Sequence, residues 1–336
     1  MFDDIDLLED ITMWHHDLMW HYKMRYMMKQ VFLVILLAFG FVAGAQNVTV
    51  RKPKKQKPAT THVTPKKERP SKQREVQSKK GKADSHSKKA EVDISPTIGK
   101  ANYTPNVKTF YANGVSFEMV EVRGGTFRMG GTSEQGSDAD SDDEYPVHSV
   151  TLSGYYIGKT EVTQALWKAV MGSNPSYWKG DNLPVEQVSW DDCQEFIRKL
   201  NALTGQNFRL PTEAEWEFAC RGGNNSRGYK YCGSNYIDNV AWYDGNTGDK
   251  THPVATKLPN ELGIYDMSGN VWEWCSDWYG KYSSGAQANP KGPYDGSYRV
   301  VRGGSWDDNA KGCRSSNRTC NSPGYRSNYL GLRLSL

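Results

Sequence analysis

Alternation of apolar and polar residues marks the first segment of the chain that predicts regular structure. From Val115 to Val122 the two kinds of side chain alternate, as they do in a strand with one buried face. Gly124 and Gly125 then supply a turn before the next apolar–polar run, at 127–129. The pattern predicts that a β-hairpin built from these two runs opens the domain.

Three short helices are predicted farther along, each with a recognisable signal at an end. The first begins at about Thr163 and ends near Gly172. The second begins after Ser189, a residue that caps helices well, and ends before Gly205. The third begins in the capping box at 212–215. Helices therefore occupy the middle of the domain.

The chain after Arg221 is rich in Trp, Asn, Gly and turn residues and has no long periodic segment. Such a region is expected to be held by packed aromatic rings, metal or disulfides rather than by regular ladders. The whole chain has 11 Trp, 19 Tyr and 32 Gly, which excludes a simple helical bundle and a wholly disordered chain. An apolar content of 37% excludes a protein with many membrane spans. The predicted class is α+β with much irregular structure.

Residues 27–45 are predicted to be a secretory signal peptide. Lys29 precedes an apolar run at 31–42, and the small residues at 43–45 form a cleavage pattern. The run is shorter than the roughly 20 residues that cross a bilayer, which favours cleavage over a permanent anchor. Acidic residues in 1–26 do not suit the start of a signal, so we interpret 1–26 as an upstream extension. The alternatives for the true start are Met24, Met27 and Met28. The domain is then exported to the periplasm, the cell surface or the medium.

Residues 46–106 are predicted to be a basic, disordered linker. The stretch 51–89 holds fifteen Lys and Arg residues against three acids and has almost no large apolar residues, although the whole chain has a net charge of only +4. Such a run attracts envelope polyanions, and a solvated spacer is the alternative. No aromatic residue is interleaved to stack on bases, so nucleic acid is not an expected partner.

Seven short blocks occur in a fixed order in the remaining segment, 107–336. The blocks are 124–130, 161–163, 184–190, 209–217, 269–274, 302–305 and 330–333. Together they resemble the formylglycine-generating enzyme, or sulfatase-modifying factor, family. The resemblance covers essentially the whole segment. It implies an α+β fold, the formylglycine-generating-enzyme/C-type-lectin-like fold, with little regular secondary structure.

The resemblance also implies a chemistry that this chain departs from. Family enzymes use oxygen and copper, held by two cysteines, to oxidise the cysteine of a Cys-x-Pro-x-Arg motif in sulfatases. Two thiolates suit Cu(I), a soft ion. Counting forward from Ser305 puts the two positions at Asp308 and Cys313, whereas counting backward from 330–333 makes Cys313 a structural cysteine. At least one catalytic cysteine is therefore absent. An altered copper pair, Cys313 with Cys320, has a spacing of seven residues instead of the family's five.

All six cysteines lie in the segment predicted to be exported, where disulfides are expected. The family's structural bridge suggests that Cys220 pairs with Cys313. Cys193 lies among apolar residues of the second predicted helix, which favours a buried free thiol.

The resemblance further implies calcium, which prefers six to eight oxygen ligands. The positions that match the first family site are Asp266, Gly269, Val271 and Glu273, and those that match the second are Asn239 and Val240.

The loop at 307–329 has the composition of a binding surface. It is dominated by Asp, Asn, Ser, Gly, Thr, Cys and Tyr, and antibody loops use several of these residues for adaptable contacts. It also resembles the variable C-terminal region of diversity-generating retroelement proteins. The residues predicted to contact a ligand are Trp306, Asp307, Asp308, Asn309, Arg314, Arg318, Tyr325 and Tyr329.

Three functions follow from these patterns. The favoured one is an exported, catalytically altered family member that binds a protein, peptide or glycan. The alternative is a formylglycine-generating oxidase with copper, and the second alternative is a structural protein of the envelope, as in gliding-motility relatives. The state of the cysteine pair separates the first two.

Overall fold

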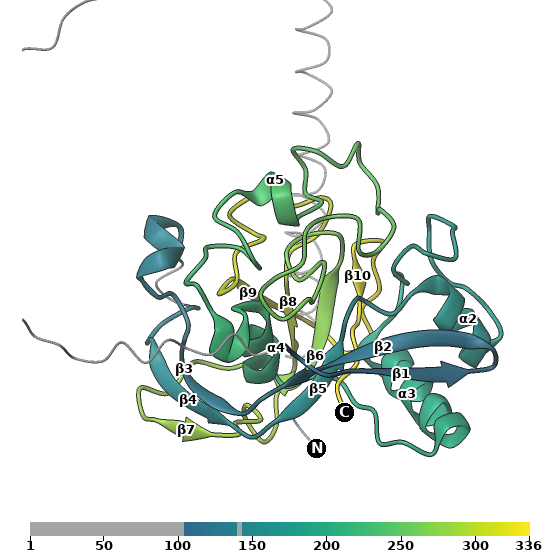
Figure 1. Cartoon of the computed structure of the whole chain (residues 1–336), viewed down its shortest axis with the longest axis horizontal. Coiled ribbons are helices and arrows are strands. Elements are labelled where there is room, and N and C mark those ends of the chain that lie inside the picture. The colour runs from purple at the N-terminus through teal and green to yellow at the C-terminus, as the bar shows by residue number, and fades with distance from the viewer. Residues whose placement is uncertain (1–103, 140–142) are drawn as a thin grey trace, which may run out of the picture. The chain divides into compact units, whose positions relative to one another are not determined.

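The computed structural model describes residues 104–139 and 143–336, which fall in one unit of the chain, 91–336. The predicted upstream extension, the signal peptide and all but the end of the basic linker lie outside the described residues. Within the part that is described, no helix has both the length and the apolar character that a membrane crossing requires. The elements of this unit are labelled in Figure 1.

A three-stranded antiparallel sheet opens the domain. It consists of β1 (Val107–Ala112), β2 (Val115–Val122) and β5 (Tyr155–Gly158), in the order β1-β2-β5. The hairpin is formed by β1 and β2, and its turn, Asn113-Gly114, has positive φ at both residues (46° and 83°). Asn-Gly suits such a turn, whose twist matches that of the strands. The prediction that 127–129 pairs with β2 was therefore wrong, because the hairpin partner precedes β2.

The run after Gly124 enters a second sheet instead. Here β3 (Gly125–Met129) pairs antiparallel with β4 (His148–Leu152), which pairs parallel with β7 (Gln287–Ala288). A Cβ atom at Gly124 would lie 2.6 Å from the Leu152 carbonyl oxygen, so only glycine fits between these chain segments. A 3₁₀ helix, η1 (Ser133–Asp138), follows β3.

The three predicted helices are confirmed, with their caps. Thr163 caps α2 (Gln164–Met171), and Gly172 ends it in a left-handed conformation. Ser189 forms a capping box at the start of α3 (Trp190–Thr204), and Thr212 does the same for α4 (Glu213–Cys220). Two shorter helices, η2 (Gly223–Asn225) and α5 (Ile237–Val240), follow. Figure 1 shows α2 and α3 beside the β1–β2 hairpin, while α4 contacts strands of the other two sheets.

The segment after Arg221 contains a third sheet, contrary to the expectation of turns alone. Its strands are β6 (Trp272–Trp278), β8 (Arg299–Arg302), β9 (Arg318–Asn321) and β10 (Leu330–Gly331), in the order β10-β6-β8-β9. These strands are short, and the central pair is buried along most of its length, so no polar–apolar alternation marks them. Long irregular segments still connect them, and the α+β fold class is confirmed.

Aromatic residues fill the core between these elements. Trp216 and Trp274 are fully buried, and Trp167 stacks on Phe196 with ring centroids 4.8 Å apart. Cys193 is fully buried in the same core as Trp167, as predicted for a packed thiol. Packed rings from helices and strands therefore form much of this core.

Candidate functional site

Asp308 occupies the position that the forward count assigns to the first copper cysteine. Its Oδ2 atom accepts hydrogen bonds from the Ser305 hydroxyl (2.5 Å) and from Trp272 Nε1 (2.8 Å). Burial raises the pKa of its carboxyl above the usual range. A carboxylate fixed in this way is a hard oxygen donor, unlike the soft thiolate that copper(I) prefers.

The two candidate cysteines lie in different surroundings. Cys313 is fully buried in an apolar cluster with Tyr231 and Val240, and burial raises its thiol pKa well above the usual range. Cys320 is half-buried on β9, beside Arg318. Within 104–139 and 143–336, no group of three or more His, Cys, Asp or Glu side chains is suited to hold a metal ion.

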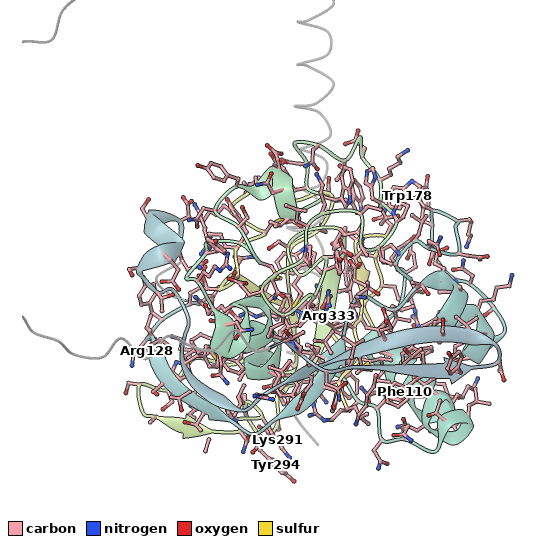
Figure 2. All side chains as sticks on the ribbon, in the orientation of Figure 1. Phe110, Arg128, Trp178, Lys291, Tyr294 and Arg333 are labelled. Carbon is pink, nitrogen blue, oxygen red and sulfur yellow. The ribbon has the colours of Figure 1, made fainter. Side chains whose placement is uncertain are left out.

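Aromatic side chains from two distant segments meet next to Asp308. The Trp306 ring contacts the Trp178 ring edge-on at 4.9 Å, and Tyr177 contacts Trp178 at 5.0 Å. Trp306 Nε1 donates to the Asn328 carbonyl oxygen (3.1 Å), which ties Trp306 to the last segment of the predicted loop. In that segment the hydroxyl groups of Tyr325 and Tyr329 lie 2.7 Å apart. We call Tyr177, Trp178, Trp306, Tyr325 and Tyr329 the aromatic surface, and Figure 2 shows Trp178 near the edge of the domain.

Sequence reasoning missed the contribution of Tyr177 and Trp178. They lie in the connection between α2 and α3, which a buried carboxylate organises. Glu186 Oε1 accepts from the backbone N–H of Trp178 (3.1 Å), and burial raises the Glu186 pKa to about 7. The sequence signal for this pair was two adjacent aromatic residues in a connection otherwise rich in polar and turn residues.

The predicted ligand residues divide into two groups. Asp307 and Asn309 are exposed, and they flank the half-buried Asp308 next to Trp306. The structure thus brings these residues to the aromatic surface. It does not bring Arg314 and Arg318 there.

Both arginines are buried in ion pairs. Arg314 is fully buried and binds Glu144 through both Nη atoms, at 2.8 and 2.5 Å. Arg318 binds both carboxylate oxygens of Glu213 at 2.7 Å. A guanidinium group paired in this way is occupied and is not available to a ligand at the aromatic surface.

The comparison with known families decides the relationship. The sulfatase-modifying factor enzyme 1-like domain matches residues 106–336.

The chain belongs to this family.

Three proteins of known name are similar to this chain. The chaperone protein LppX of Paenibacillus barcinonensis is 36% identical over 242 residues, covering 57% of this chain and 79% of that protein. The formylglycine-generating enzyme of Streptomyces coelicolor is 31% identical over 284 residues, covering 64% of this chain and 88% of that enzyme. Treponema denticola variable protein 1, whose structure is solved, is 36% identical in sequence. The two structures match with a TM-score of 0.62 over 69% of this chain and 99% of that protein. The proteins similar to this chain thus include one that is named as an enzyme and two that are not.

The family's structural disulfide does not have its counterpart here. All six cysteines, which fall within the described residues, are free. The Cys232 thiol hydrogen-bonds the Cys220 thiol, whose Sγ atom lies 3.8 Å from the Met267 carbonyl oxygen. The prediction that Cys220 pairs with Cys313 was wrong, because the Cys313 side chain packs into a separate apolar cluster.

The first calcium position of the family fits this chain in part. Glu273 is the less available carboxylate, because Arg333 donates to both of its oxygens at 2.6 Å and Trp216 Nε1 donates to Oε2 at 2.6 Å. Asp266 is buried, and its pKa is raised to about 6 mainly by burial. Glu161 Oε1 is buried without a hydrogen-bond partner among the described residues, while its Oε2 accepts from the Asn270 amide at 3.2 Å.

Because of these contacts, we expect residues other than Glu273 to bind the cation. We propose that Asp266 and Glu161, together with backbone oxygens of Gly269 and Val271, hold Ca²⁺, which would neutralise two buried carboxylates. The second family position is less suited, since the Asn239 carbonyl oxygen already accepts from the Leu258 N–H at 2.9 Å. Val240, the other residue of that position, is buried in α5.

Calcium is therefore expected to stabilise the domain. When Ca²⁺ is added back to EGTA-treated protein at about 100 times its dissociation constant, the free energy of unfolding should rise by about 2.7 kcal/mol. The corresponding increase in Tm is about 5–10 °C. Differential scanning calorimetry with Ca²⁺, and with Mg²⁺ as the control ion, measures the shift. Glu161→Gln should abolish the shift. An equal Tm with and without Ca²⁺ would contradict the assignment.

Proposed function

We propose that this chain is an exported, non-oxidising member of the sulfatase-modifying factor family, which binds a polypeptide ligand at the aromatic surface. The main support for the proposal is the way in which the side chains of Asp308 and Cys313 are each held by their neighbours. Asp308 is hydrogen-bonded to Ser305 and Trp272, and Cys313 is sealed among apolar side chains. Copper(I) needs two accessible thiolates at one point, whereas of these two residues one is a carboxylate and the other is a buried thiol.

The aromatic surface has the composition of a protein-binding site. Tyr177 is 66% exposed and Tyr325 is 37% exposed, so both side chains are accessible to a ligand. Tyrosine and tryptophan supply large contact areas at low conformational-entropy cost, and they are enriched at binding hot spots. Trp178 packs edge-on against Trp306, which is only 8% exposed, so these two rings are held in place before a ligand arrives.

The relatives are compatible with this proposal. The family member from Treponema denticola is named a variable protein, and it shares 36% identity with this chain. The exposed Asp307 and Asn309 beside Trp306 add polar contacts of the kind that rim a binding site.

Exchange of the exposed tyrosines tests the proposal. Peptides selected from a displayed random library on the wild-type chain are expected to bind the Tyr177→Ser/Tyr325→Ser variant at least tenfold more weakly, because truncating a hot-spot residue costs about 1–2 kcal/mol. Surface plasmon resonance measures the dissociation constants. The matched control is Tyr236→Ser/Tyr294→Ser, which removes two tyrosines that are 75% and 99% exposed.

The two variants make the result decisive. Loss of binding in the first variant alone supports the aromatic surface. Equal binding by the wild type and both variants would contradict the proposal, and so would a loss confined to the control. A glycan array probed with the same three proteins identifies a glycan ligand, and binding restricted to glycans would refute the polypeptide assignment.

A further inference from the structure

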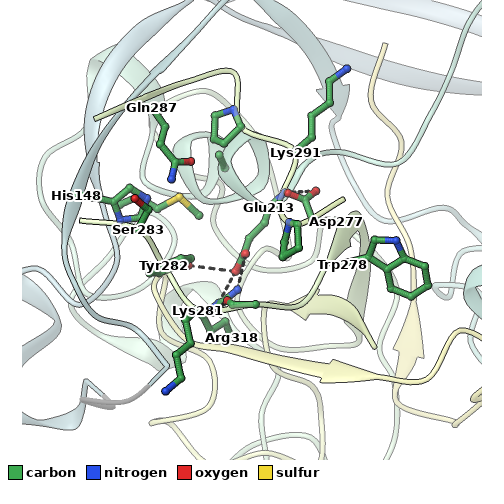
Figure 3. Close-up of a pocket in the computed structure, with 16 residues that line it drawn as sticks. His148, Glu213, Asp277, Trp278, Lys281, Tyr282, Ser283, Gln287, Lys291 and Arg318 are labelled. Atoms are coloured by element: carbon green, nitrogen blue, oxygen red, sulfur yellow. Dashed lines mark hydrogen bonds and ion pairs between the residues drawn. The ribbon is translucent and has the colours of Figure 1, made fainter. Parts of the chain in front are cut away.

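A polar cavity of about 310 Å³ lies on another part of the domain (Figure 3). The start of β4, the first turn of α4, the end of β6 and the segment 280–293 line it. Its volume is at the lower end of the range for small-molecule sites. Figure 2 shows Lys291, which lines this cavity, at the opposite edge of the domain from Trp178. The cavity is therefore separate from the aromatic surface.

One wall of the cavity is a completed ion-pair network. Arg318 binds both oxygens of Glu213, and the Tyr282 hydroxyl donates to Glu213 Oε1 at 3.1 Å. Another nitrogen of Arg318 donates to the Gly280 carbonyl oxygen at 2.9 Å. These groups have their partners, so they shape the cavity and leave recognition to other side chains.

Two buried side chains each present an open polar atom to the cavity. Asp277 is 4% exposed, and its Oδ2 atom accepts from the Glu213 N–H (3.0 Å) and the Ser276 hydroxyl (2.9 Å). Its Oδ1 atom has no hydrogen-bond partner among the described residues. His148 is 2% exposed, and its Nδ1 atom lies 3.0 Å from the Pro146 carbonyl oxygen. A carbonyl only accepts, so Nδ1 donates its N–H, and in this tautomer Nε2 is an acceptor.

The open atoms define the ligand by its hydrogen bonds. Two acceptors, Asp277 Oδ1 and His148 Nε2, require a ligand that donates, while Ser283 and Gln287 at the mouth can both donate and accept. Lys281 and Lys291 point outward at the mouth in Figure 3, and their charge disfavours a cation. The two acceptors disfavour an anion. A neutral molecule with several hydroxyl groups satisfies both conditions.

The apolar part of the wall has a matching role. Met129, Pro290 and Pro293 line the cavity without hydrogen-bonding side chains, so they can cover the C–H face of a ring. We infer that this cavity binds a neutral monosaccharide unit, with Asp277 and His148 accepting hydrogen bonds from its hydroxyl groups. The inference does not depend on the polypeptide ligand proposed for the aromatic surface.

Binding at this cavity depends on pH in a defined direction. Burial, with Glu213 as the next cause, raises the Asp277 pKa to about 7. Other charged groups interact with Asp277, among them Glu215, Arg209 and Arg299. The titratable groups that line the same cavity include His148, Lys281 and Lys291. Hydroxyl donors stabilise the carboxylate form, which is the minor form at pH 6 and the major form at pH 8. Affinity is therefore expected to rise about five- to tenfold from pH 6 to pH 8.

Titration with simple glycosides tests the inference. The probes are the methyl β-glycosides of glucose, galactose and N-acetylglucosamine, added to the full chain and followed by calorimetry and saturation-transfer NMR. At least one is expected to bind with a dissociation constant on the order of 1–10 mM at pH 8. Asp277→Asn, which keeps the shape of the side chain, should weaken binding at least tenfold. Asp191→Asn removes an exposed carboxylate from α3 and should leave affinity unchanged.

Gln287→Ala provides a second variant at the mouth, in case Asp277→Asn does not fold, and a loss of about three- to tenfold is expected. The inference is overturned if none of the three glycosides binds saturably up to 50 mM, or if both cavity variants bind as the wild type does. The Tyr177→Ser/Tyr325→Ser variant should retain glycoside binding. Failure at the cavity is thereby distinguished from failure at the aromatic surface.

Discussion

Replacing Arg333 with methionine is expected to lower the free energy of unfolding by about 3–5 kcal/mol, because it leaves the Glu273 carboxylate buried without its cation. Both residues are fully buried, and two hydrogen bonds of 2.6 Å join them. Arg333 also donates to the carbonyl oxygens of Gly158 (2.9 Å) and Tyr265 (3.0 Å). The side chain therefore ties β5, β6 and the C-terminal segment together.

Urea unfolding followed by tryptophan fluorescence measures this effect. Arg333→Lys keeps the charge but loses the two-pronged geometry, so it should fall between the wild type and Arg333→Met. The matched control is Arg198→Met, because Arg198 and Glu195 form an exposed pair on α3. That control should unfold as the wild type does. If Arg333→Met lowers the free energy of unfolding by less than about 1 kcal/mol, the stabilising role of the buried Arg333–Glu273 pair is contradicted.

The helices could be predicted from sequence because their signals are local. Thr163, Ser189 and Thr212 each accept a hydrogen bond from a backbone N–H of the first turn, and a glycine follows α2 and α3 directly. Neither signal depends on distant residues. The turn signal of the hairpin is also local. The prediction placed the turn at Gly124-Gly125, although Asn113-Gly114 is a stronger turn signal.

The third sheet could not be predicted in the same way. Its outer strand β10 has two residues and pairs with β6, which lies more than 50 residues earlier in the chain. The four-stranded arrangement depends on contacts between segments distant in sequence. The buried arginines show the same limitation. Arg314 and Arg318 lie in a polar loop that favours exposure, yet each is neutralised by a glutamate more than 100 residues away.

The candidate site was partly predictable. Spacing from Ser305 placed Asp308 at a copper-ligand position, and the structure shows it hydrogen-bonded to Ser305 itself. Composition pointed to Trp306, Tyr325 and Tyr329, while Trp178 required a contact between segments 128 residues apart in the chain. Asp277 and His148 were not predicted as one site, because the cavity forms only when β4 and β6 are brought together by the fold.

The chain is expected to leave a Cys-x-Pro-x-Arg peptide unoxidised, at least 1,000-fold below a formylglycine-generating enzyme under the same conditions. Cysteine oxidation with copper needs two thiolates at one ion, and the count from Ser305 puts the hydrogen-bonded carboxylate of Asp308 at one of those two places. Cys313 is fully buried and its thiol pKa is raised well above the usual range, so the remaining thiol also resists metal binding.

The most direct test of a binding function, as opposed to an oxidising one, loads the full chain with copper under reducing conditions. The protein is then incubated in air with a Cys-x-Pro-x-Arg peptide, the peptide mass is followed, and an active formylglycine-generating enzyme serves as the positive control. Our account predicts that the peptide thiol stays intact while the control converts it. An aldehyde product formed by this chain, and lost in Cys313→Ser, would contradict the account and establish a copper site at Cys313.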